Sequence, residues 1–162
     1  MNKIKLLKNV LIFSSIFSFL TSCSKGHIRY GVASPYLEVE KNEEGILKDV
    51  LPSYINDKIN NKDNFVLFLH RTHCSYCNDT INNFLTPFLQ ENPIVIYGLN
   101  GDEFELNENE YSLYQEIIKP LGNIYQGYRV VPYFAIFEEG QFIQGELDSE
   151  FFELLITTYV KL

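Results

Sequence analysis

The sequence predicts an α/β domain in which a mixed central β-sheet is flanked by helices, in the order β-α-β-α-β-α-β-β-α. Two continuous apolar runs, residues 65–69 and 94–97, are typical of strands that are buried on both faces of a sheet. Helical patterns separate the early strands, and crossover helices of this kind make those strands parallel. Near the C-terminus, a turn at residues 138–141 joins two further strands and adds an antiparallel pair.

The first 22 residues predict a targeting signal rather than part of the fold. Three lysines among the first eight residues precede an apolar run at residues 10–20, which is too short for a comfortable membrane span. The segment ends in Leu-Thr-Ser-Cys, which resembles the lipobox of bacterial lipoproteins. That resemblance implies that Cys23 is acylated and anchors the chain to a membrane. An ordinary signal peptide with an incidental cysteine is the alternative.

The remaining chain is long enough for one domain, which we place at residues 36–162, after a lipid-anchored linker at residues 23–35. Hydrophobic residues make up 46% of the sequence and include 13 Phe and 11 Tyr, which is enough for a packed core. The formal charge is −8, and it becomes −11 when residues 1–22 are removed. This charge excludes nucleic-acid binding, which needs a basic surface.

In the N-terminal half, residues 36–40 alternate between apolar and polar and predict the first strand. Residues 46–59 have helical spacing, and Pro52 places the start of that helix nearby, because proline is tolerated in a first turn. A polar stretch at residues 60–64 ends the helix. The buried strand at residues 65–69 follows it.

The middle of the chain predicts a helix from Cys74 to about residue 91, with Pro87 expected to kink or shorten it. The buried strand at residues 94–97 comes next. The acidic, Asn-rich stretch at residues 100–110 is interpreted as a solvated loop. A short helix at residues 111–119 then ends at a proline and a glycine.

The C-terminal part predicts a hairpin and a last helix. Residues 133–137 and 142–146 are its two strands, separated by the Glu-Glu-Gly-Gln turn. Asp148 or Ser149 is expected to cap a helix that runs through Tyr159.

A Cys-x-x-Cys motif, Cys74 and Cys77, lies where the buried strand turns into a helix. Unpaired backbone N–H groups and the helix dipole favour an anion at a helix start, so Cys74 is pushed toward the reactive thiolate. Cys77 lies one turn further on, close enough to close a disulfide or to resolve a mixed one. The strand-then-helix context indicates redox chemistry. A structural disulfide and a metal site are the alternatives.

Three parts of the chain together resemble the thioredoxin superfamily, over roughly residues 36–160. They are the Cys74-Ser75-Tyr76-Cys77 motif after a buried strand, the Arg129-Val130-Val131-Pro132 segment, and the strand and glycine-containing hairpin at residues 134–141. Within the superfamily, an Arg-Thr-His-Cys-Ser-Tyr-Cys stretch on a short lipoprotein looks like the thioredoxin-like bacteriocin-accessory type.

The resemblance implies a thioredoxin-like fold and assigns roles to the motif residues. Cys74 would be the attacking thiol and Cys77 the buried resolving thiol. Pro132 would be cis and would pack against the cysteine pair, and the backbone of Val131 would pair with an extended substrate segment. A trans proline that opens an edge strand is the alternative.

The chain departs from thioredoxins proper around the motif. A tryptophan precedes the first cysteine in those proteins, whereas His73 does so here and is expected to tune the Cys74 thiolate. Tyr76 resembles the aromatic residue of glutaredoxin-like sites. Thioredoxins also keep a buried acid on the preceding strand, and here that position is Phe68. Proton transfer at Cys77 must then rely on water or another group.

Several neighbouring side chains have two interpretations. His70 is expected to be a hydrogen-bonded histidine at the margin of the sheet. Arg71 could stabilise the thiolate or point into solvent. Tyr76, Tyr128 and Tyr133 are either an aromatic platform for a client or half-buried packing residues.

Together these features predict a membrane-anchored, extracytoplasmic thiol–disulfide oxidoreductase on the periplasmic or cell-surface side. It would exchange disulfides with protein cysteines, and it would use a redox partner that the sequence does not identify. No cofactor and no resident metal are expected, and nothing demands a dimer, so we expect a monomer. One alternative to this function is a copper or zinc carrier that binds the ion through both thiols, His70 and His73. His73 and Cys74 are adjacent in the sequence, however, so their side chains converge poorly on one ion. The other is a non-catalytic accessory lipoprotein with the same fold.

Overall fold

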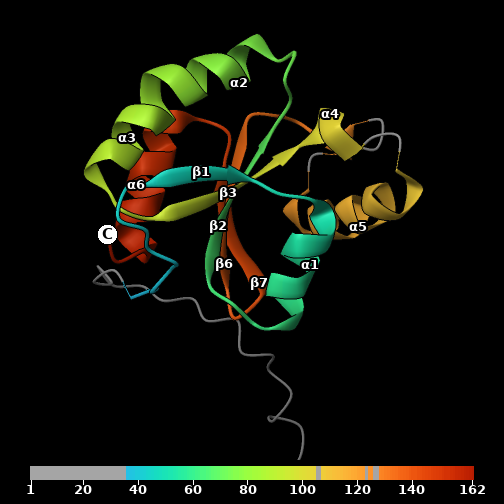
Figure 1. Ribbon diagram of the computed structural model, residues 1–162, viewed down its shortest axis with the longest axis horizontal. Helices are drawn as coiled ribbons and strands as arrows, with labels where there is room; N and C mark the ends of the chain where they lie inside the picture. Colours follow the sequence, from blue (N-terminus) through green and yellow to red (C-terminus); the bar gives the residue numbers. More distant parts are fainter. Residues whose placement is uncertain (1–35, 105–106, 123, 126–127) are drawn as a thin grey trace, which may run out of the picture. The chain divides into compact units, whose positions relative to one another are not determined.

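Five strands form the central sheet of the computed structural model, in the spatial order β1-β3-β2-β6-β7 (Figure 1). They are β1 (Ile46–Asp49), β2 (Phe65–His70), β3 (Val95–Asn100), β6 (Tyr133–Glu138) and β7 (Gln141–Glu146). β3 pairs in parallel with both β1 and β2, whereas β6 is antiparallel to β2 and β7 is antiparallel to β6. The predicted mixed sheet is confirmed.

The structure describes residues 36–104, 107–122, 124–125 and 128–162. At positions 124, 125 and 128 it describes the backbone alone. The predicted signal peptide, Cys23 and the predicted linker at residues 23–35 lie outside the described residues. Within the described ranges, no helix is long and apolar enough to cross a membrane.

Helices cover both faces of the sheet (Figure 1). One face carries α2 (Ser75–Thr80), the π-helical segment η1 (Ile81–Leu85), α3 (Thr86–Glu91) and α6 (Ser149–Tyr159). The other face carries α1 (Pro52–Asn60) and α5 (Glu108–Ile118). Two shorter helical segments, α4 (Gly101–Phe104) and the 3₁₀ turn η2 (Lys119–Leu121), flank α5 in the sequence.

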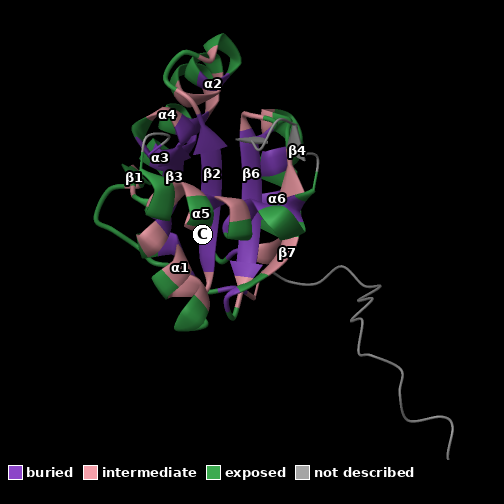
Figure 2. Ribbon diagram, turned by 90° about the vertical axis from the view of Figure 1, so that its right-hand side faces the viewer, coloured by how far each residue is buried: buried purple, intermediate pink, exposed green. Residues whose placement is uncertain are grey.

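The alternation of side chains along β2 divides the core into two layers. Val66 and Phe68 pack with α3 and α6, whereas Leu67 and Leu69 pack with α1 and α5. All four are fully buried, as is the centre of the sheet in Figure 2. Because burying one such side chain contributes about 1.5–3 kcal/mol, β2 is a firm base for the motif that follows it.

The first strand differs from the prediction. Residues 36–40 form no strand; Leu37 makes only an isolated bridge with Val160. Leu37 and Val39 are buried. The alternation of apolar and polar residues there therefore reflects side-chain packing against the core, and not strand pairing. The first strand is β1, within the stretch assigned helical spacing, and the helix begins only at Pro52. β1 was missed because it is short and mostly exposed, so it lacks an apolar pattern.

The helix after Cys74 runs to Glu91, as predicted, but Pro87 neither ends nor shortens it. The helix widens instead over η1, and the Thr86 N–H donates to the carbonyl of Ile81, five residues back. The hydroxyl of Thr86 donates to the same carbonyl, at 2.8 Å. This π-helical segment lets the chain pass Pro87, which has no N–H to donate.

The stretch at residues 100–110 is not simply a solvated loop. Residues 101–104 form α4, and Phe104 is buried. α5 begins at Glu108, one turn before the predicted start, and the Asn107 side chain caps it by accepting from the N–H groups of Asn109 and Glu110. The sequence pattern hid these elements because their polar residues face outward or form caps.

A two-stranded hairpin precedes the cis-proline segment and was not predicted. Its strands are β4 (Ile124–Tyr125) and β5 (Tyr128–Arg129). The second hairpin, β6–β7, was predicted, and its turn places Glu139 at φ 49° and Gly140 at φ 72°. Positive φ at both central residues is typical of the tight turn that fits the twist of paired strands.

The last helix is confirmed. Asp148 is its N-cap and accepts from the Glu150 N–H at 2.8 Å. Phe152 holds α6 on the sheet by stacking on Phe134, with ring centroids 3.8 Å apart.

Candidate functional site

Cys74 and Cys77 lie at the carboxyl end of β2, where the chain enters α2, and they form a disulfide with Cα atoms 5.2 Å apart. Cys74 is the N-cap of α2 and keeps an extended backbone. Its sulfur accepts a hydrogen bond from the Cys77 N–H, at 3.1 Å. Donors at a helix start stabilise negative charge, so the sulfur of Cys74 is the one that the fold prepares to become a thiolate.

The two sulfurs differ in access. Cys74 is partly exposed, whereas Cys77 is completely buried. An incoming thiolate can therefore reach the sulfur of Cys74, and Cys77 is shielded behind it. The resemblance to the thioredoxin superfamily implied a buried Cys77, and Cys77 is buried; the roles of the two thiols remain predictions.

Asp102, just after β3, fixes the loop that leads into the motif. Its carboxylate accepts from the Arg71 guanidinium at 2.6 Å, from the Thr72 N–H at 2.9 Å and from the His73 N–H at 3.5 Å. Partial burial by itself raises the pKa of the Asp102 carboxyl. The hydrogen bond and charge of Arg71, together with the two backbone donors, outweigh burial and hold this pKa below its ordinary value.

This anchor matches neither interpretation of Arg71. Its side chain pairs with Asp102 rather than extending into solvent alone. The Asn100 side chain adds a second tie by donating to the Thr72 hydroxyl at 2.8 Å. His73 follows with an exposed side chain beside Cys74. The expected tuning of Cys74 by His73 remains a prediction.

His70, the last residue of β2, is buried and bonds through Nε2 to the Asp49 carboxylate, at 2.8 Å. The prediction of a hydrogen-bonded histidine at the sheet margin is confirmed. Asp49 lies on β1, and the bond crosses β3 above Gly98, where a Cβ atom would collide with the carboxylate. The His70 ring stacks on Phe68, the apolar residue that replaces the expected acid, with centroids 5.2 Å apart.

The peptide bond between Val131 and Pro132 is cis, as the resemblance implied. The segment before this bond is fixed to α5, because the Arg129 N–H donates to the Tyr114 hydroxyl at 3.3 Å. Burial raises the pKa of this hydroxyl, so Tyr114 is neutral at ordinary pH. The Arg129 guanidinium lies 3.6 Å above the ring of Tyr133.

Tyr133 is therefore a packing residue and not part of an aromatic platform, since it is buried beneath Arg129. Tyr76 behaves differently, because its side chain is 76% exposed beside the cysteine pair. The side chain of Tyr128 lies outside what the structure describes. Of the proposed platform, only Tyr76 is shown to be available to a client.

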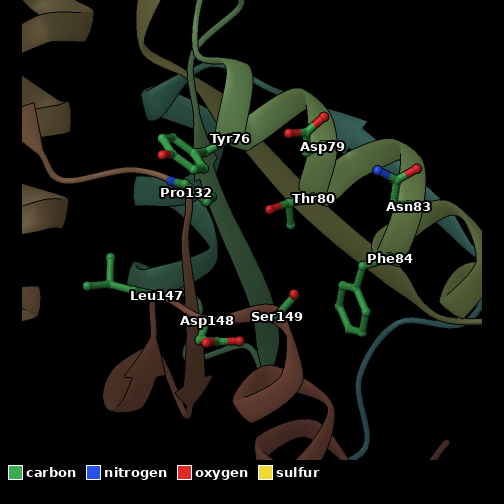
Figure 3. Close-up of a pocket in the computed structure, with 9 residues that line it drawn as sticks. All are labelled: Tyr76, Asp79, Thr80, Asn83, Phe84, Pro132, Leu147, Asp148 and Ser149. Carbon is green, nitrogen blue, oxygen red and sulfur yellow. The ribbon is translucent and has the colours of Figure 1, made fainter.

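A groove of about 550 Å³ opens beside Tyr76, the residue that precedes Cys77 in the motif (Figure 3). One wall is the face of α2 and η1 that carries Tyr76, Asp79 and Asn83, and Pro132 lies next to the Tyr76 ring. The opposite wall is the junction of β7 and α6, with Leu147 and Asp148. The groove thus connects the redox motif, the cis-proline and the start of α6.

A metal site made from the motif residues finds no support in this geometry. The two cysteines are bonded to each other, and Nε2 of His70 is bonded to Asp49. Over the described ranges, no group of three or more His, Cys, Asp and Glu side chains is placed to hold a metal ion.

Sequence reasoning missed Asp49, Asp102 and Tyr114. All three act on residues distant in sequence, so no local pattern marks them. The sequence did contain one signal for Asp102. This residue follows the buried strand β3, and the motif follows the parallel neighbouring strand β2, so both lie at the carboxyl edge of the sheet, where functional polar side chains gather.

Solved thioredoxin structures resemble this chain. A thioredoxin from Nicotiana alata superposes with a TM-score of 0.52 at 11% identity, covering 75% of this chain and 99% of that one. Thioredoxin O1 from Arabidopsis thaliana, in its oxidised state, gives 0.47 at 17% identity, with 72% and 99% covered. A thioredoxin from Malassezia sympodialis gives 0.46 at 17% identity, with 82% and 98% covered.

The superposition on the Nicotiana alata thioredoxin shows that the fold is thioredoxin-like, a mixed five-stranded sheet flanked by helices. No protein-family model matches the sequence, and no curated protein sequence matches it.

Proposed function

We propose that this protein is a thiol–disulfide oxidoreductase that acts on protein cysteines through Cys74 and Cys77. One observation carries the proposal: Cys74 is partly exposed and its sulfur accepts an N–H bond at the start of α2, while its disulfide partner Cys77 is buried. A purely structural bridge needs no such asymmetry, and closing so short a loop constrains the unfolded chain little.

The exchange proceeds in two steps. The thiolate of a client cysteine attacks the sulfur of Cys74, the client–Cys74 bond forms, and the Cys74–Cys77 bond breaks. Cys77 leaves with the electron pair and takes up a proton. A second client thiolate then attacks the client sulfur of the mixed disulfide, and Cys74 leaves as a thiolate. The client has gained a disulfide, and the protein holds two reduced cysteines. The reverse steps reduce a client disulfide.

The direction depends on how strongly the fold stabilises the reduced pair. The N–H bond to the Cys74 sulfur and the adjacent His73 both favour a Cys74 thiolate. A stabilised reduced form makes the disulfide more oxidising. These groups support a disulfide donor or isomerase over a reductant.

We also propose that the protein is a lipoprotein of an extracytoplasmic compartment, anchored through Cys23. The basic, apolar and lipobox-like parts of residues 1–23 support this location, and cysteine pairs are oxidised there. The formal charge of −11 after removal of residues 1–22 supports a tethered monomeric domain that does not lie on anionic lipid. The resemblance to the bacteriocin-accessory type is in keeping with such a lipoprotein.

The reduction potential tests the redox function. Full-length protein carrying Cys23→Ser, so that two cysteines remain, is equilibrated against glutathione buffers, and the fraction of free thiol is measured by alkylation. We expect one reversible two-electron transition between about −120 and −180 mV. A potential near about −270 mV would make the protein a reductant. The absence of any reversible transition would overturn the redox function.

Trapping tests the roles of the two cysteines. Cys77→Ser should accumulate mixed disulfides with client proteins through Cys74, because the resolving thiol is gone, whereas Cys74→Ser should accumulate none. Equal trapping by both variants would contradict the assigned roles. If a Cys74/Cys77 double variant kept full biological function, the accessory role would replace the enzymatic one.

Metabolic labelling with palmitate tests the anchor. Wild-type protein should carry label and sediment with membranes, and Cys23→Ser should do neither. Unlabelled wild-type protein in the soluble fraction would contradict lipidation without affecting the redox proposal.

A further inference from the structure

We propose that the groove beside Tyr76 selects extended client segments that carry lysine or arginine side chains near their cysteine. This inference rests on the proposed function, because the groove matters only if a client approaches Cys74. Tyr76 lies between the cysteines in the sequence, and Pro132 adjoins its ring (Figure 3). A client segment that reaches the Cys74 sulfur therefore has the groove directly beside it.

The groove places one carboxylate on each wall. Asp79 comes from α2, and Asp148 comes from the start of α6 (Figure 3). Among the described residues that line the groove, none is Lys, Arg or His. Asp148 uses one oxygen to cap α6 and is exposed. The Asp79 side chain is exposed and forms no hydrogen bond or ion pair with any described residue. Neither charge is neutralised within the described chain.

The two chain segments that form the walls of the groove are also rich in acidic residues and lack basic ones. Residues 75–93 supply α2, η1 and α3, and residues 130–160 supply β6, β7 and α6. Neither segment contains a Lys, Arg or His, and together they contain eight acidic residues. Six of the eight lie on α2, α3, the end of β7 or the start of α6, namely Asp79, Glu91, Glu146, Asp148, Glu150 and Glu153. Glu138 and Glu139 lie at the opposite end of β6, near Asn64 and Phe65. The basic residues of the described chain lie in the other segments.

The apolar residues that line the groove also fit a client segment with lysine or arginine side chains. Lysine and arginine have long aliphatic stems that pack on apolar surface while the charged head stays in water. Phe84 and Leu147 line the groove together with the two aspartates. The exposed Tyr76 ring can accept a cation on its face. An acidic client segment would instead face uncompensated repulsion.

The physics sets the size of the effect. Exposed ion pairs are individually weak, but charges of one sign around a site steer association and act mainly on the on-rate, in a salt-dependent way. Because Tyr76 of the Cys-x-x-Cys motif lines the groove, we expect this acceleration in the first exchange step. We expect a basic segment to react about threefold to tenfold faster than a neutral one at low salt.

The test uses two synthetic peptides of equal length, each with one central cysteine. One carries lysines three and four residues from the cysteine, and the other carries glutamines there. Each peptide reduces the disulfide of the full-length protein carrying Cys23→Ser, and mixed disulfide is counted after acid quenching and alkylation. Each rate is divided by the rate of the same peptide with hydroxyethyl disulfide, which is neutral. This ratio removes any effect of lysine on the reactivity of the peptide thiol.

Two double variants locate the effect. D79N/D148N removes both groove charges and keeps the α6 cap, because asparagine caps a helix as well as aspartate. D57N/E116Q removes two exposed charges from α1 and α5, on the other face of the sheet, and so changes the net charge equally. We expect the preference for the lysine peptide to fall to within about twofold of unity in the groove variant and to persist in the control variant.

The outcomes separate this inference from the function on which it rests. If neither peptide forms a mixed disulfide, the oxidoreductase function fails. If both peptides react equally with the wild-type protein, the function stands and the selectivity is wrong. If D57N/E116Q abolishes the preference as fully as D79N/D148N does, net charge rather than the groove is responsible. A third peptide with leucines at these positions covers the apolar alternative, and a faster reaction with it than with the lysine peptide would overturn the selectivity.

Discussion

Asp102 ties the β3 end of the sheet to the loop before Cys74 through hydrogen bonds with Arg71, Thr72 and His73. Asp102→Asn should lower the free energy of unfolding at pH 7 by about 1–3 kcal/mol, because it weakens hydrogen bonds to a charged group. The pKa of Asp102 is lowered in the folded protein. Its stabilising contribution is therefore present above the unfolded pKa of about 3.9 and is lost as pH falls through the folded pKa.

Urea unfolding at pH 7 and at pH 3 checks this prediction. The difference between wild type and Asp102→Asn should be largest at pH 7 and should shrink at pH 3. Asp57→Asn, at an exposed position on α1, is the control and should change stability little at either pH. A difference that is the same at both pH values would show that the carboxylate charge is not what holds the loop.

The His70–Asp49 pair makes a second prediction at the scale of single residues. Asp49→Ala leaves Nε2 of a buried imidazole without its partner and should cost about 1–3 kcal/mol in the free energy of unfolding. His70→Phe removes the polar partner while keeping a ring against Phe68. Asp49→Ala should therefore cost less when His70 is already phenylalanine.

A double-mutant cycle on these two positions, measured by urea unfolding, gives the coupling. Equal costs of Asp49→Ala in both backgrounds would mean that the pair contributes nothing to stability. Gly98→Ala is an independent probe, because its Cβ would displace the Asp49 carboxylate from above β3. It should destabilise the wild type more than the His70→Phe variant.

At the scale of elements, the β6–β7 turn makes two opposite predictions from adjacent residues. Gly140 has φ 72°, and a Cβ there would collide with the Ile59 carbonyl at the end of α1. Gly140→Ala should lower the free energy of unfolding by more than about 1 kcal/mol. Glu139 has φ 49°, a region that asparagine tolerates better than glutamate.

Glu139→Asn should raise the midpoint of thermal unfolding slightly while Gly140→Ala lowers it. The Glu139 N–H keeps its bond to the Asn64 side chain in both variants, since a backbone group makes it. Shifts of the same sign for both substitutions would show that the backbone of this turn does not control the stability of the hairpin.

Local sequence signals predicted some elements well and could not predict others. The five apolar residues of β2 and the Asp148 cap of α6 act within a few positions of themselves, so a pattern reveals them. β1 depends on pairing with β3, and its exposed residues carry no pattern. Likewise, the β4–β5 hairpin rests on only two paired positions per strand.

At the scale of the whole molecule, the sequence identified the candidate redox pair but not the residues that hold it in place. The Cys-x-x-Cys motif and the cis-proline were both predicted and are joined beside one groove. The residues that hold them come from other strands and helices: Asp102 from the end of β3, Asp49 from β1 and Tyr114 from α5. Tertiary contacts alone create these pairings, so only a folded structure reveals them.

The coupling between redox state and global stability gives the last prediction. The folded protein stabilises charge on the Cys74 sulfur through the Cys77 N–H and the start of a helical run of residues 75–91, and the unfolded chain cannot do so. Folding should therefore favour the reduced pair, and the reduced protein should unfold at a higher urea concentration than the oxidised protein at pH 7. In a closed thermodynamic cycle, each 30 mV by which folding raises the reduction potential of the cysteine pair equals about 1.4 kcal/mol of the difference in unfolding free energy between the two redox forms.

The cycle is closed by unfolding both redox forms of the Cys23→Ser protein and by measuring the reduction potentials of the folded chain and of the chain in urea. An oxidised form more stable than the reduced form would show that the fold prefers the disulfide, and the protein would then act as a reductant.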